Sequence, residues 1–254
     1  MLLYDLHPAV IAFSTERHCS AAEAPYDGFN ITHYTGDEPA HVEACRQELC
    51  RRLKIDDRHL VVPHQVHGTQ IAEITAANLG SAFEGIDAVV TRLTNTCIGV
   101  STADCVPIVL YDIRNRAIAA IHAGWRGTVA RIASKTLLYM SERYGTRQED
   151  VKAAIGPSIG PDAFEVGTEV VDAFADAGYD IESLAHRSSR WHVNLWEANA
   201  IDLRTAGLTD KNISVAGLCS FANPSRFFSA RRLGINSGRM FTGCILTDHE
   251  TIRY

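Results

Sequence analysis

Short apolar runs bounded by turn-forming residues recur along this chain and predict β-strands. They lie at residues 10–14, 85–91, 97–101, 106–111, 117–121, 151–155 and 213–218. Apolar positions spaced three and four residues apart predict helices among them, at about residues 37–53, 129–144, 168–177 and 194–207. Strands and helices are therefore mixed along the whole sequence, and no internal repeat or low-complexity linker separates them.

The most informative stretch is residues 103–127, ADCVPIVLYDIRNRAIAAIHAGWRG. Its two apolar runs predict a β-hairpin, and a turn centred in residues 112–115 would pair residues whose numbers sum to 227. Cys105 would then face His122, with Cβ atoms about 4.5–5.5 Å apart, and a thiolate and an imidazole at that separation can share one metal ion. A three-residue turn would shift the register and make the two side chains diagonal neighbours. The hairpin alone also fits a buried core thiol beside a hydrogen-bonded histidine.

The residues that follow His122 favour an active site over a packed core. Gly127 permits a tight backbone turn, and Thr128 can cap the helix predicted at residues 129–144. Free N–H groups at a helix N-terminus bind anions, and the guanidinium of Arg126 lies next to them in sequence. Arg126, Gly127 and Thr128 are therefore candidate ligands for a phosphate group.

A third metal ligand is predicted upstream, where a proline interrupts an apolar strand. His64 and His67 lie three residues apart, so on a continuous strand the two imidazoles would point to opposite faces. His67 precedes Gly68, which lets the backbone turn there. We expect His67 to join Cys105 and His122 at one metal ion.

Further acidic and basic residues are candidates for the chemistry. Asp104, beside Cys105, would orient an imidazole or hold a substrate hydroxyl, or else is a turn aspartate. Glu165 would act as a general acid or base, or else is a carboxylate favoured by a helix N-terminus. A cluster of arginines either forms a solvated surface or holds phosphate, for which Arg231 and Arg232 are the main candidates; it comprises Arg226, Arg231, Arg232 and Arg239.

Composition narrows the class of protein. The 254 residues suit one large domain or two small ones, and 46% hydrophobic residues predict a full core. A net charge of −6 without a Lys/Arg run argues against general nucleic-acid binding. No run approaches the roughly 18 apolar residues of a transmembrane helix, and the N-terminus lacks the basic region of a signal peptide. Seven cysteines without CxxC spacing predict a reducing, cytoplasmic setting.

The chain resembles the laccase-domain family, or YfiH-type proteins, once described as multicopper polyphenol oxidases. The matching segments follow the family's order over nearly the whole chain after residue 25, and the ADC and HAGWRG pieces are the most specific. The segments are HQVHGT, GIDAVVT, STADCVPIVLYD, AIAAIHAGWRGT, AAIGPSIGP, FEVGTEVV, HVNLWEAN and RFFSARRLGINSGRM. The resemblance implies a single α+β domain over residues 1–254, with mixed β-sheets flanked by helices.

The resemblance also implies a zinc ion, or in some members copper, held by His67, Cys105 and His122. It implies phosphorolysis of adenosine, inosine and methylthioadenosine to the base and a sugar 1-phosphate, together with deamination of adenosine. A different assignment within the family is the editing of peptidoglycan precursors, by hydrolysis of a wrongly loaded amino acid from UDP-muramic acid. Ser158 stands where the family commonly has cysteine, and Ala230 where it usually has tyrosine.

Chemistry separates the possible functions. An oxidase is disfavoured, because blue-copper oxidases need several further histidines and the eleven histidines here include no His-x-His pair. A zinc-dependent purine nucleoside enzyme needs three protein ligands and one open position. An amide hydrolase would use zinc and water, or a Cys105 thiolate with His122 as base. A non-catalytic zinc protein would need a fourth ligand, for which His64 is nearest in sequence. We expect a small-molecule nucleoside and phosphate as partners, with no nucleic acid and no membrane.

Overall fold

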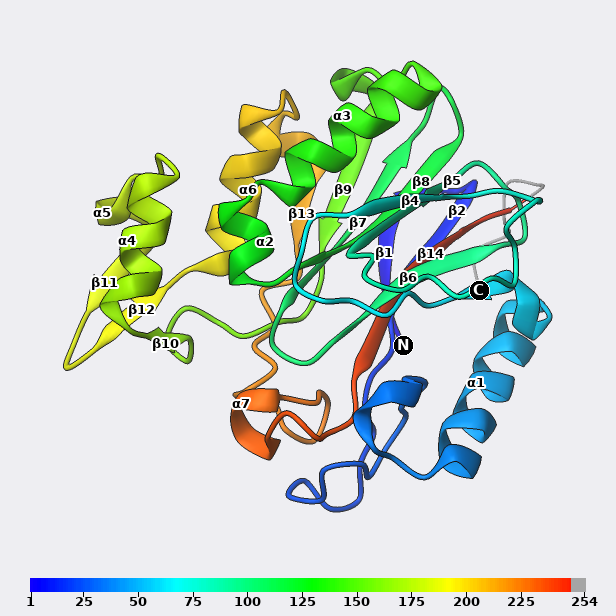
Figure 1. Ribbon diagram of the computed structural model, residues 1–254, viewed down its shortest axis with the longest axis horizontal. Helices are drawn as coiled ribbons and strands as arrows, with labels where there is room; N and C mark the ends of the chain where they lie inside the picture. The colour runs from blue at the N-terminus through cyan, green and yellow to red at the C-terminus, as the bar shows by residue number, and fades with distance from the viewer. Residues whose placement is uncertain (248–254) are drawn as a thin grey trace.

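A mixed six-stranded sheet lies at the centre of the computed structural model, which describes residues 1–247 (Figure 1). Its outer pairs, β13–β9 and β4–β5, are parallel, and its other neighbours are antiparallel. In spatial order the strands are β13 (Ile213–Val215), β9 (Val151–Ile155), β7 (Val106–Asp112), β8 (Ala117–Ala123), β5 (Ala88–Thr91) and β4 (Ile71–Ile74).

A second, five-stranded mixed sheet packs against one face of the first. Val109 and Ile118 of the six-stranded sheet share a buried cluster with Ala12 and Val100 of the five-stranded one. Such alternation of side chains between two faces is what the two-residue period of a strand dictates. In spatial order its strands are β1 (Leu2–His7), β2 (Val10–Ser14), β14 (Met240–Leu246), β6 (Cys97–Thr102) and β3 (Leu60–Val61).

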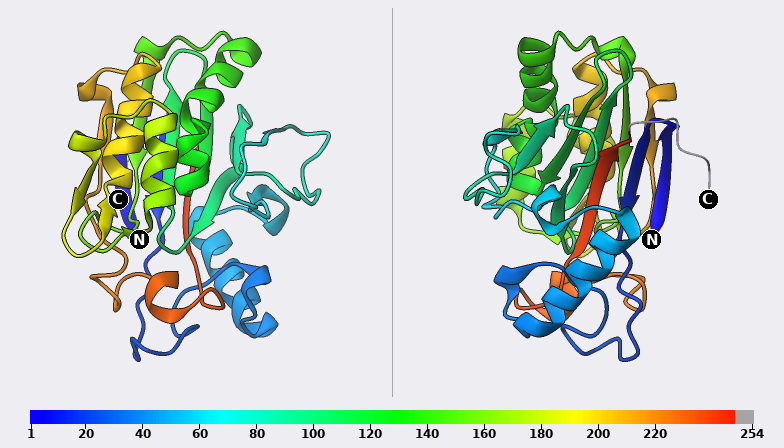
Figure 2. Two further views of the ribbon diagram at one scale, coloured as in Figure 1. Left: turned by 60° about the vertical axis from the view of Figure 1, so that its left-hand side comes forward. Right: turned by 90° about the vertical axis from the view of Figure 1, so that its right-hand side faces the viewer.

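Helices cover the two outer faces of this double layer (Figures 1 and 2). Ile108 and Leu110 point away from the five-stranded sheet into a core formed with α3 (Ile132–Tyr144) and α6 (Leu195–Thr205). On the other side, Leu49 of α1 (Pro39–Leu53) packs against the outer face of the five-stranded sheet. The α+β class with mixed sheets flanked by helices is therefore confirmed.

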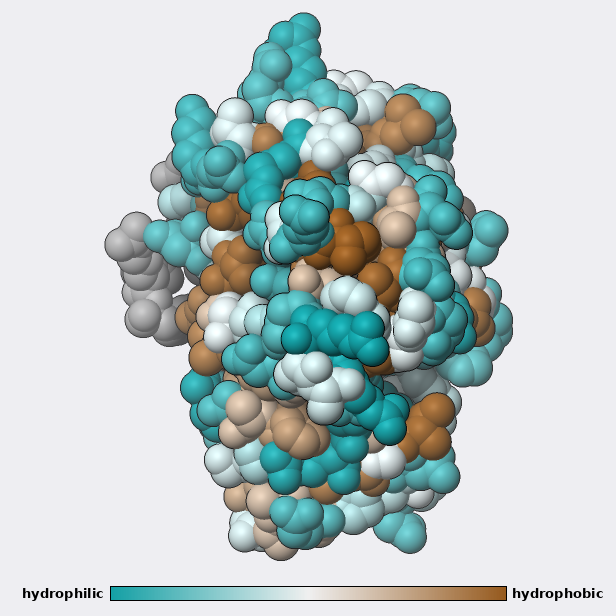
Figure 3. Space-filling model, turned by 90° about the vertical axis from the view of Figure 1, so that its left-hand side faces the viewer, coloured by the Kyte–Doolittle hydropathy of each residue, from teal (hydrophilic) through white to brown (hydrophobic). Residues whose placement is uncertain are grey.

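The remaining elements are short. On the surface of the molecule over α4 (Thr168–Asp176) and α5 (Ile181–Leu184), hydrophilic and hydrophobic residues are interspersed (Figure 3). No helix within residues 1–247 is long and apolar enough to span a bilayer. These elements are α2 (Trp125–Val129), α4 (Thr168–Asp176), α5 (Ile181–Leu184), α7 (Ala230–Leu233), the 3-10 turns His33–Thr35, Asp57–His59, Gln148–Asp150 and Asp210–Asn212, and an antiparallel sheet of β10 (Glu165–Val166), β12 (Trp191–Val193) and β11 (Ala185–Arg187).

Most predicted elements form, although β5 and β13 are shorter than the strands predicted at 85–91 and 213–218, and β1 was not predicted. Two further differences lie at helix starts. The helix predicted at residues 194–207 forms as α6, and Asn194 caps it, since its side chain accepts a hydrogen bond from the Glu197 N–H. The helix predicted from Asp37 begins at Pro39, with Glu38 at the cap position, and the Asp37 side chain instead bonds His41. The predicted cap at Thr128 is wrong, because α2 is a separate helical turn and α3 begins only at Ile132.

Candidate metal centre and active site

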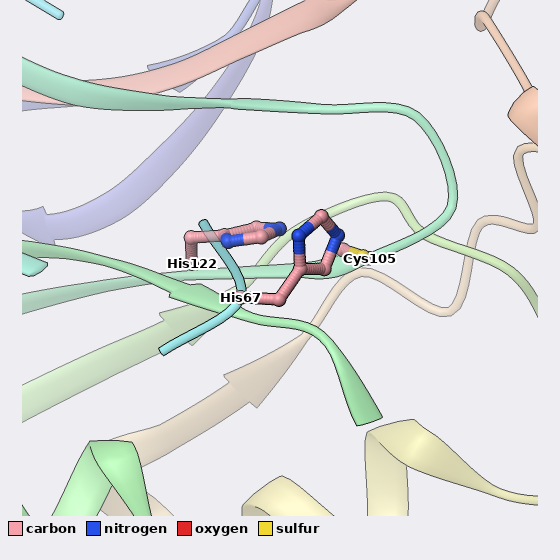
Figure 4. Close-up of side chains that lie close together, drawn as sticks. All are labelled: His67, Cys105 and His122. Atoms are coloured by element: carbon pink, nitrogen blue, oxygen red, sulfur yellow. The ribbon is translucent and has the colours of Figure 1, made fainter. Parts of the chain in front are cut away.

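Three side chains from separate parts of the chain converge beside the six-stranded sheet (Figure 4). His67 lies in the loop between β3 and β4, Cys105 lies between β6 and β7, and His122 lies on β8. Their candidate ligand atoms are all within 4.8 Å of one another. The two imidazole rings meet edge to face, with centroids 4.8 Å apart. The predicted convergence of one sulfur and two imidazoles is therefore found.

The register of the hairpin differs from the prediction. β7 and β8 pair Pro107 with His122, so paired numbers sum to 229 rather than 227, and Cys105 is a diagonal neighbour of His122. The physical reason is the turn. The Asp112 carboxylate accepts hydrogen bonds from the backbone N–H groups of Arg114 and Asn115, and this turn holds a four-residue loop between the strands.

A residue that the sequence analysis missed supports two of the three candidate ligands. Asp87, just before β5, is fully buried, and its carboxylate accepts a 2.8 Å hydrogen bond from Nδ1 of His122. It also accepts the backbone N–H groups of His67 at 2.9 Å and Gly68 at 2.8 Å. Because a carboxylate only accepts, Nδ1 of His122 carries the proton and Nε2 is left free for a metal. The sequence offered one indication of this role, because Asp87 is a single acidic residue at the start of a buried strand.

The backbone is strained at two positions beside the candidate ligands. His67 has a φ of 63° and Asp104 a φ of 87°, values that non-glycine residues rarely adopt. The Asp104 carboxylate is held at both oxygens, by the Ser220 hydroxyl at 2.6 Å and the Arg231 backbone N–H at 2.7 Å. These contacts fix the turn that places Cys105, so the structure supports a positioning role for Asp104.

The electrostatics of the cluster favour a thiolate. Burial by itself raises the pKa of the Cys105 thiol, but the neighbouring His122 and His67 outweigh burial and lower that pKa well below its ordinary value. For His122, burial acts in the opposite direction and lowers the pKa. The neighbouring Cys105 and Asp87 outweigh burial, so the pKa of His122 is raised. Both shifts favour the charged forms of the two groups, and the thiolate is the form of cysteine that ligates metals.

The donor set fits zinc. One thiolate sulfur and two imidazole nitrogens are typical zinc ligands, and a carboxylate behind a ligating histidine is the usual support. Within residues 1–247 no fourth His, Cys, Asp or Glu joins the cluster. His64, the fourth ligand expected for a closed structural site, instead bonds Glu84 at 2.6 Å and packs on the Tyr34 ring. A tetrahedral zinc ion with three protein ligands keeps its fourth coordination position open for water or substrate.

Gly124 borders the cluster so closely that a side chain there would enter it. A Cβ atom on Gly124 would lie 3.0 Å from Cδ2 of His67 and 3.1 Å from Sγ of Cys105. Its φ of −64° is open to any residue, so only space requires glycine. We therefore expect Gly124→Ala to fold but to bind zinc about five- to 150-fold more weakly, since overpacking costs about 1–3 kcal/mol. Chelator competition measures this, and unchanged affinity would contradict the crowding argument.

All three predicted anion ligands after His122 lie on α2, and two of them are buried. Gly127 and Thr128 are buried, and the Thr128 hydroxyl donates to the Gly124 carbonyl at 3.1 Å. Arg126 is exposed, with its guanidinium over the Trp125 ring. Only Arg126 of these three presents a polar side chain to solvent.

The downstream candidates differ in the groups that they contact. Arg231 bonds the Asp104 carboxylate through its N–H and the Glu165 carbonyl through its guanidinium. The Arg232 guanidinium instead donates to the Phe221 carbonyl. Glu165 lies on β10, where its carboxylate pairs with Arg190 at 3.3 Å. It does not occupy the helix N-terminus that was considered for it.

Arg239 is the arginine of that cluster that interacts electrostatically with a candidate metal ligand, Cys105. Burial lowers its pKa, and its guanidinium interacts electrostatically with Cys105 and Asp104. The guanidinium donates to backbone carbonyls, including that of Ser237 at 2.6 Å and that of Ile235 at 2.8 Å. None of the ion pairs within residues 1–247 involves Arg239. A half-buried cation without a carboxylate partner is suited to an anionic ligand.

Known proteins similar to this chain match it over nearly its whole length. The chain is 41% identical over 244 residues to a purine nucleoside phosphorylase of Bacteroides thetaiotaomicron, covering 92% of this chain and 90% of the relative. It is 44% identical over 244 residues to the adenosine deaminase RL5 of an unknown prokaryotic organism, covering 92% and 93%. Among solved structures, YlmD from Geobacillus stearothermophilus superposes with a TM-score of 0.90 at 28% identity, covering 96% and 94%.

The family assignment follows from the extent of these matches. YfiH of Bacillus licheniformis superposes with a TM-score of 0.89 at 29% identity, covering 94% of this chain and 93% of that one. Residues 11–247 match the family described as multi-copper polyphenol oxidoreductase laccase. With its YfiH- and YlmD-like fold, the chain belongs to that laccase-domain family.

Proposed function

We propose that this chain is a zinc-dependent purine nucleoside phosphorylase that acts on adenosine, inosine and methylthioadenosine and also deaminates adenosine. The observation that carries the proposal is the cluster of His67, Cys105 and His122 with no fourth protein ligand among the described residues. Relatives that align with 92% of this chain and are named for these two activities support the same reading. We expect both substrates to be small molecules.

The candidate ligands would hold zinc, which when bound supplies Lewis acidity and lowers the pKa of water toward about 7. In deamination, water adds to C6 of the purine and ammonia leaves. The protein's part is to hold a proton on Nδ1 of His122 through Asp87, which keeps the other ring nitrogen free. Asp104 holds the backbone beside Cys105 through its bonds to Ser220 and Arg231.

In phosphorolysis, a phosphate oxygen bonds to C1′ of the ribose while the bond from C1′ to N9 breaks. The electron pair leaves with the purine, which then takes up a proton. A phosphate dianion needs cations that are not already paired with carboxylates. Arg239 meets this requirement, and we assign it the phosphate together with Arg126 and Arg231. Gly127 and Thr128 then support α2 beneath Arg126 rather than contact the anion.

The direct test is a chromatographic scan of nucleosides with and without inorganic phosphate, paired with metal analysis of the same protein. The proposal expects about one zinc per site and phosphate-dependent release of adenine or hypoxanthine, with ammonia from adenosine. Zinc-loaded protein that turns over no nucleoside would reject it.

Replacing Arg239 by methionine should raise the KM for phosphate roughly tenfold or more. The physical reason is the loss of a charge-assisted hydrogen bond, which contributes about 1.5–3 kcal/mol. Steady-state kinetics with varied phosphate measures the effect, and adenosine deamination should change much less because it uses no phosphate. Arg232→Met is the matched control, since the Arg232 guanidinium contacts the carbonyl and the ring of Phe221, whereas Arg239 interacts electrostatically with Cys105 and Asp104. Equal effects of both substitutions would contradict the assignment.

Amide hydrolysis is a second candidate, and the lowered pKa of Cys105 is the observation that favours it. A thiolate with His122 as base could attack a carbonyl carbon, but a thiolate bound to zinc is not free to do so. We expect iodoacetamide at neutral pH to alkylate Cys105 in metal-free protein and to spare it after zinc is added. Mass spectrometry of the peptides measures this. Alkylation that zinc does not slow would favour the thiolate mechanism instead.

A further inference from the structure

A tyrosine that the sequence analysis did not select lies beside Arg239. Tyr34 belongs to the 3-10 turn His33–Thr35, and its ring packs on the His64 imidazole with centroids 4.5 Å apart. The residue is 42% exposed, so part of the ring can be reached from solvent. Arg239 interacts electrostatically with Tyr34 as well as with Cys105. Tyr34 is therefore a neighbour of the guanidinium to which we assign the phosphate.

Hydrogen bonds hold the segment that carries Tyr34 against Arg239. The Asn30 side chain accepts a hydrogen bond from the Arg239 backbone N–H at 3.2 Å, directly before β14 begins. The Thr32 hydroxyl lies 2.8 Å from the hydroxyl of Ser101, near the end of β6. The segment is thus fixed to both strands, and the position of Tyr34 beside Arg239 does not depend on a single contact.

The hydroxyl group of Tyr34 has weakly used hydrogen-bonding capacity. Its contact with Oε1 of Gln65 is 3.4 Å, whereas O–H···O bonds are usually about 2.5–3.0 Å long. That oxygen already accepts the Ser101 N–H at 2.8 Å, and the Gln65 amide donates to the Ser101 carbonyl at 2.7 Å. The Ser101 hydroxyl, another neighbour of Tyr34, is paired with that of Thr32. A ligand would therefore find the phenol able to donate a shorter bond.

The phenol of Tyr34 is in the form that donates. Burial raises its pKa above the ordinary value and outweighs the opposing effect of Arg239. A neutral phenol places no negative charge beside the guanidinium and offers its O–H to an anion. A hydrogen bond to a phosphate dianion is charge-assisted, so it is stronger than the long contact with a neutral amide oxygen.

A second tyrosine near Arg239 differs in this respect. Tyr26 also interacts electrostatically with Arg239. Its hydroxyl, however, donates to the backbone carbonyl of Thr35. The two tyrosines share a charged neighbour, but the O–H of Tyr26 is committed to the backbone. Tyr26 is therefore a matched control for Tyr34.

We propose that the Tyr34 hydroxyl donates a hydrogen bond to the phosphate ion that Arg239 holds, which makes Tyr34 a phosphate-binding residue of this active site. The inference rests on the proposed phosphorolysis and on the assignment of Arg239. The His64 ring and the fixed Gln65 side chain hold the phenol in place before the anion arrives, so little conformational freedom is lost on binding.

The test compares Tyr34→Phe with Tyr26→Phe in the zinc-loaded, full-length protein. Tyr34→Phe removes only the hydroxyl and should raise the KM for phosphate roughly tenfold, as expected for a lost hydrogen bond to a charged group. The KM for inosine should change much less. Tyr26→Phe should keep the wild-type KM for phosphate. A Tyr34→Phe protein with the wild-type KM for phosphate, or equal losses in the two variants, overturns the proposal.

Binding of inorganic phosphate without a nucleoside separates this inference from the proposed function. A titration followed by phosphorus NMR should show the same roughly tenfold loss of affinity in Tyr34→Phe and none in Tyr26→Phe. Wild type that binds phosphate but turns over no nucleoside rejects the proposed function, whereas the titrations of the variants still decide the role of Tyr34. Wild type that binds no phosphate overturns the inference.

A double variant shows whether Tyr34 and Arg239 hold the same ion. Groups that bind one ligand together are coupled, so their effects do not combine independently. The loss of phosphate affinity in Tyr34→Phe combined with Arg239→Met should be smaller than the product of the two separate losses. Losses that simply multiply would place the effect of Tyr34 elsewhere and contradict the proposal.

Discussion

Replacing Cys105 by alanine is expected to remove zinc from the candidate metal centre and to abolish both phosphorolysis and deamination. Cys105 is the only sulfur in the cluster within residues 1–247, and without it two imidazoles remain to hold the ion. Loss of a residue that merely supports a ligand costs roughly 10–100-fold in metal affinity or activity, so loss of a ligand should cost more. Metal analysis and nucleoside chromatography on the same preparation measure both effects.

Cys219→Ala is the control for this prediction. Cys219 is also a half-buried free thiol, but its sulfur accepts the Gly160 N–H at 3.2 Å and lies outside the cluster. This variant should keep zinc in the metal centre and turn over nucleosides. A Cys105→Ala protein that folds and still phosphorylyses inosine would show that the cluster is not the reacting centre.

Replacing Asp87 by asparagine is expected to weaken zinc binding at the metal centre by about 10–100-fold. The single amide oxygen can accept only some of the hydrogen bonds that the two carboxylate oxygens accept from His122, His67 and Gly68. The amide nitrogen would face N–H groups that it cannot bond, so the His122 ring loses its fixed tautomer and the strained His67 backbone loses its support. Competition between the protein and a zinc chelator measures the affinity.

Asp112→Asn separates support of the metal from ordinary destabilisation. Asp112 is as buried as Asp87, and it too accepts several hydrogen bonds, but these hold the turn between β7 and β8. This control should lower the melting temperature and leave zinc affinity unchanged. If the two variants lose stability and zinc affinity in the same proportion, Asp87 has no specific role toward the metal.

The candidate ligands could be predicted from the sequence because the hairpin brings distant residues together by simple pairing. Cys105 and His122 remain neighbours even though the register is shifted, since Gly124 stands opposite Cys105 and leaves space for its sulfur. His67 was identified by elimination and by the glycine that follows it. Its unusual φ of 63° depends on Asp87, which no local pattern connects to it.

The parts that could not be predicted depend on contacts between distant segments. The helix start at Thr128 was wrong because a left-handed residue, Arg131 with a φ of 61°, divides one apolar-periodic stretch into two helices. Arg239 could be identified only as one arginine in a cluster, since its neighbours Cys105 and Asp104 are more than a hundred residues away. Local periodicity carries no information on such pairings.

The position of β14 has a consequence for how the protein is made. This strand, at residues Met240–Leu246, lies between β2 and β6 and is the element that joins the first strands of the chain to the middle ones. During synthesis, β2 and β6 leave the ribosome before β14, so each keeps an unpaired edge until β14 follows. Such edges are sites of aggregation. The nascent chain is therefore prone to aggregate in the interval between the emergence of β6 and that of β14, because both open edges are then available to other chains.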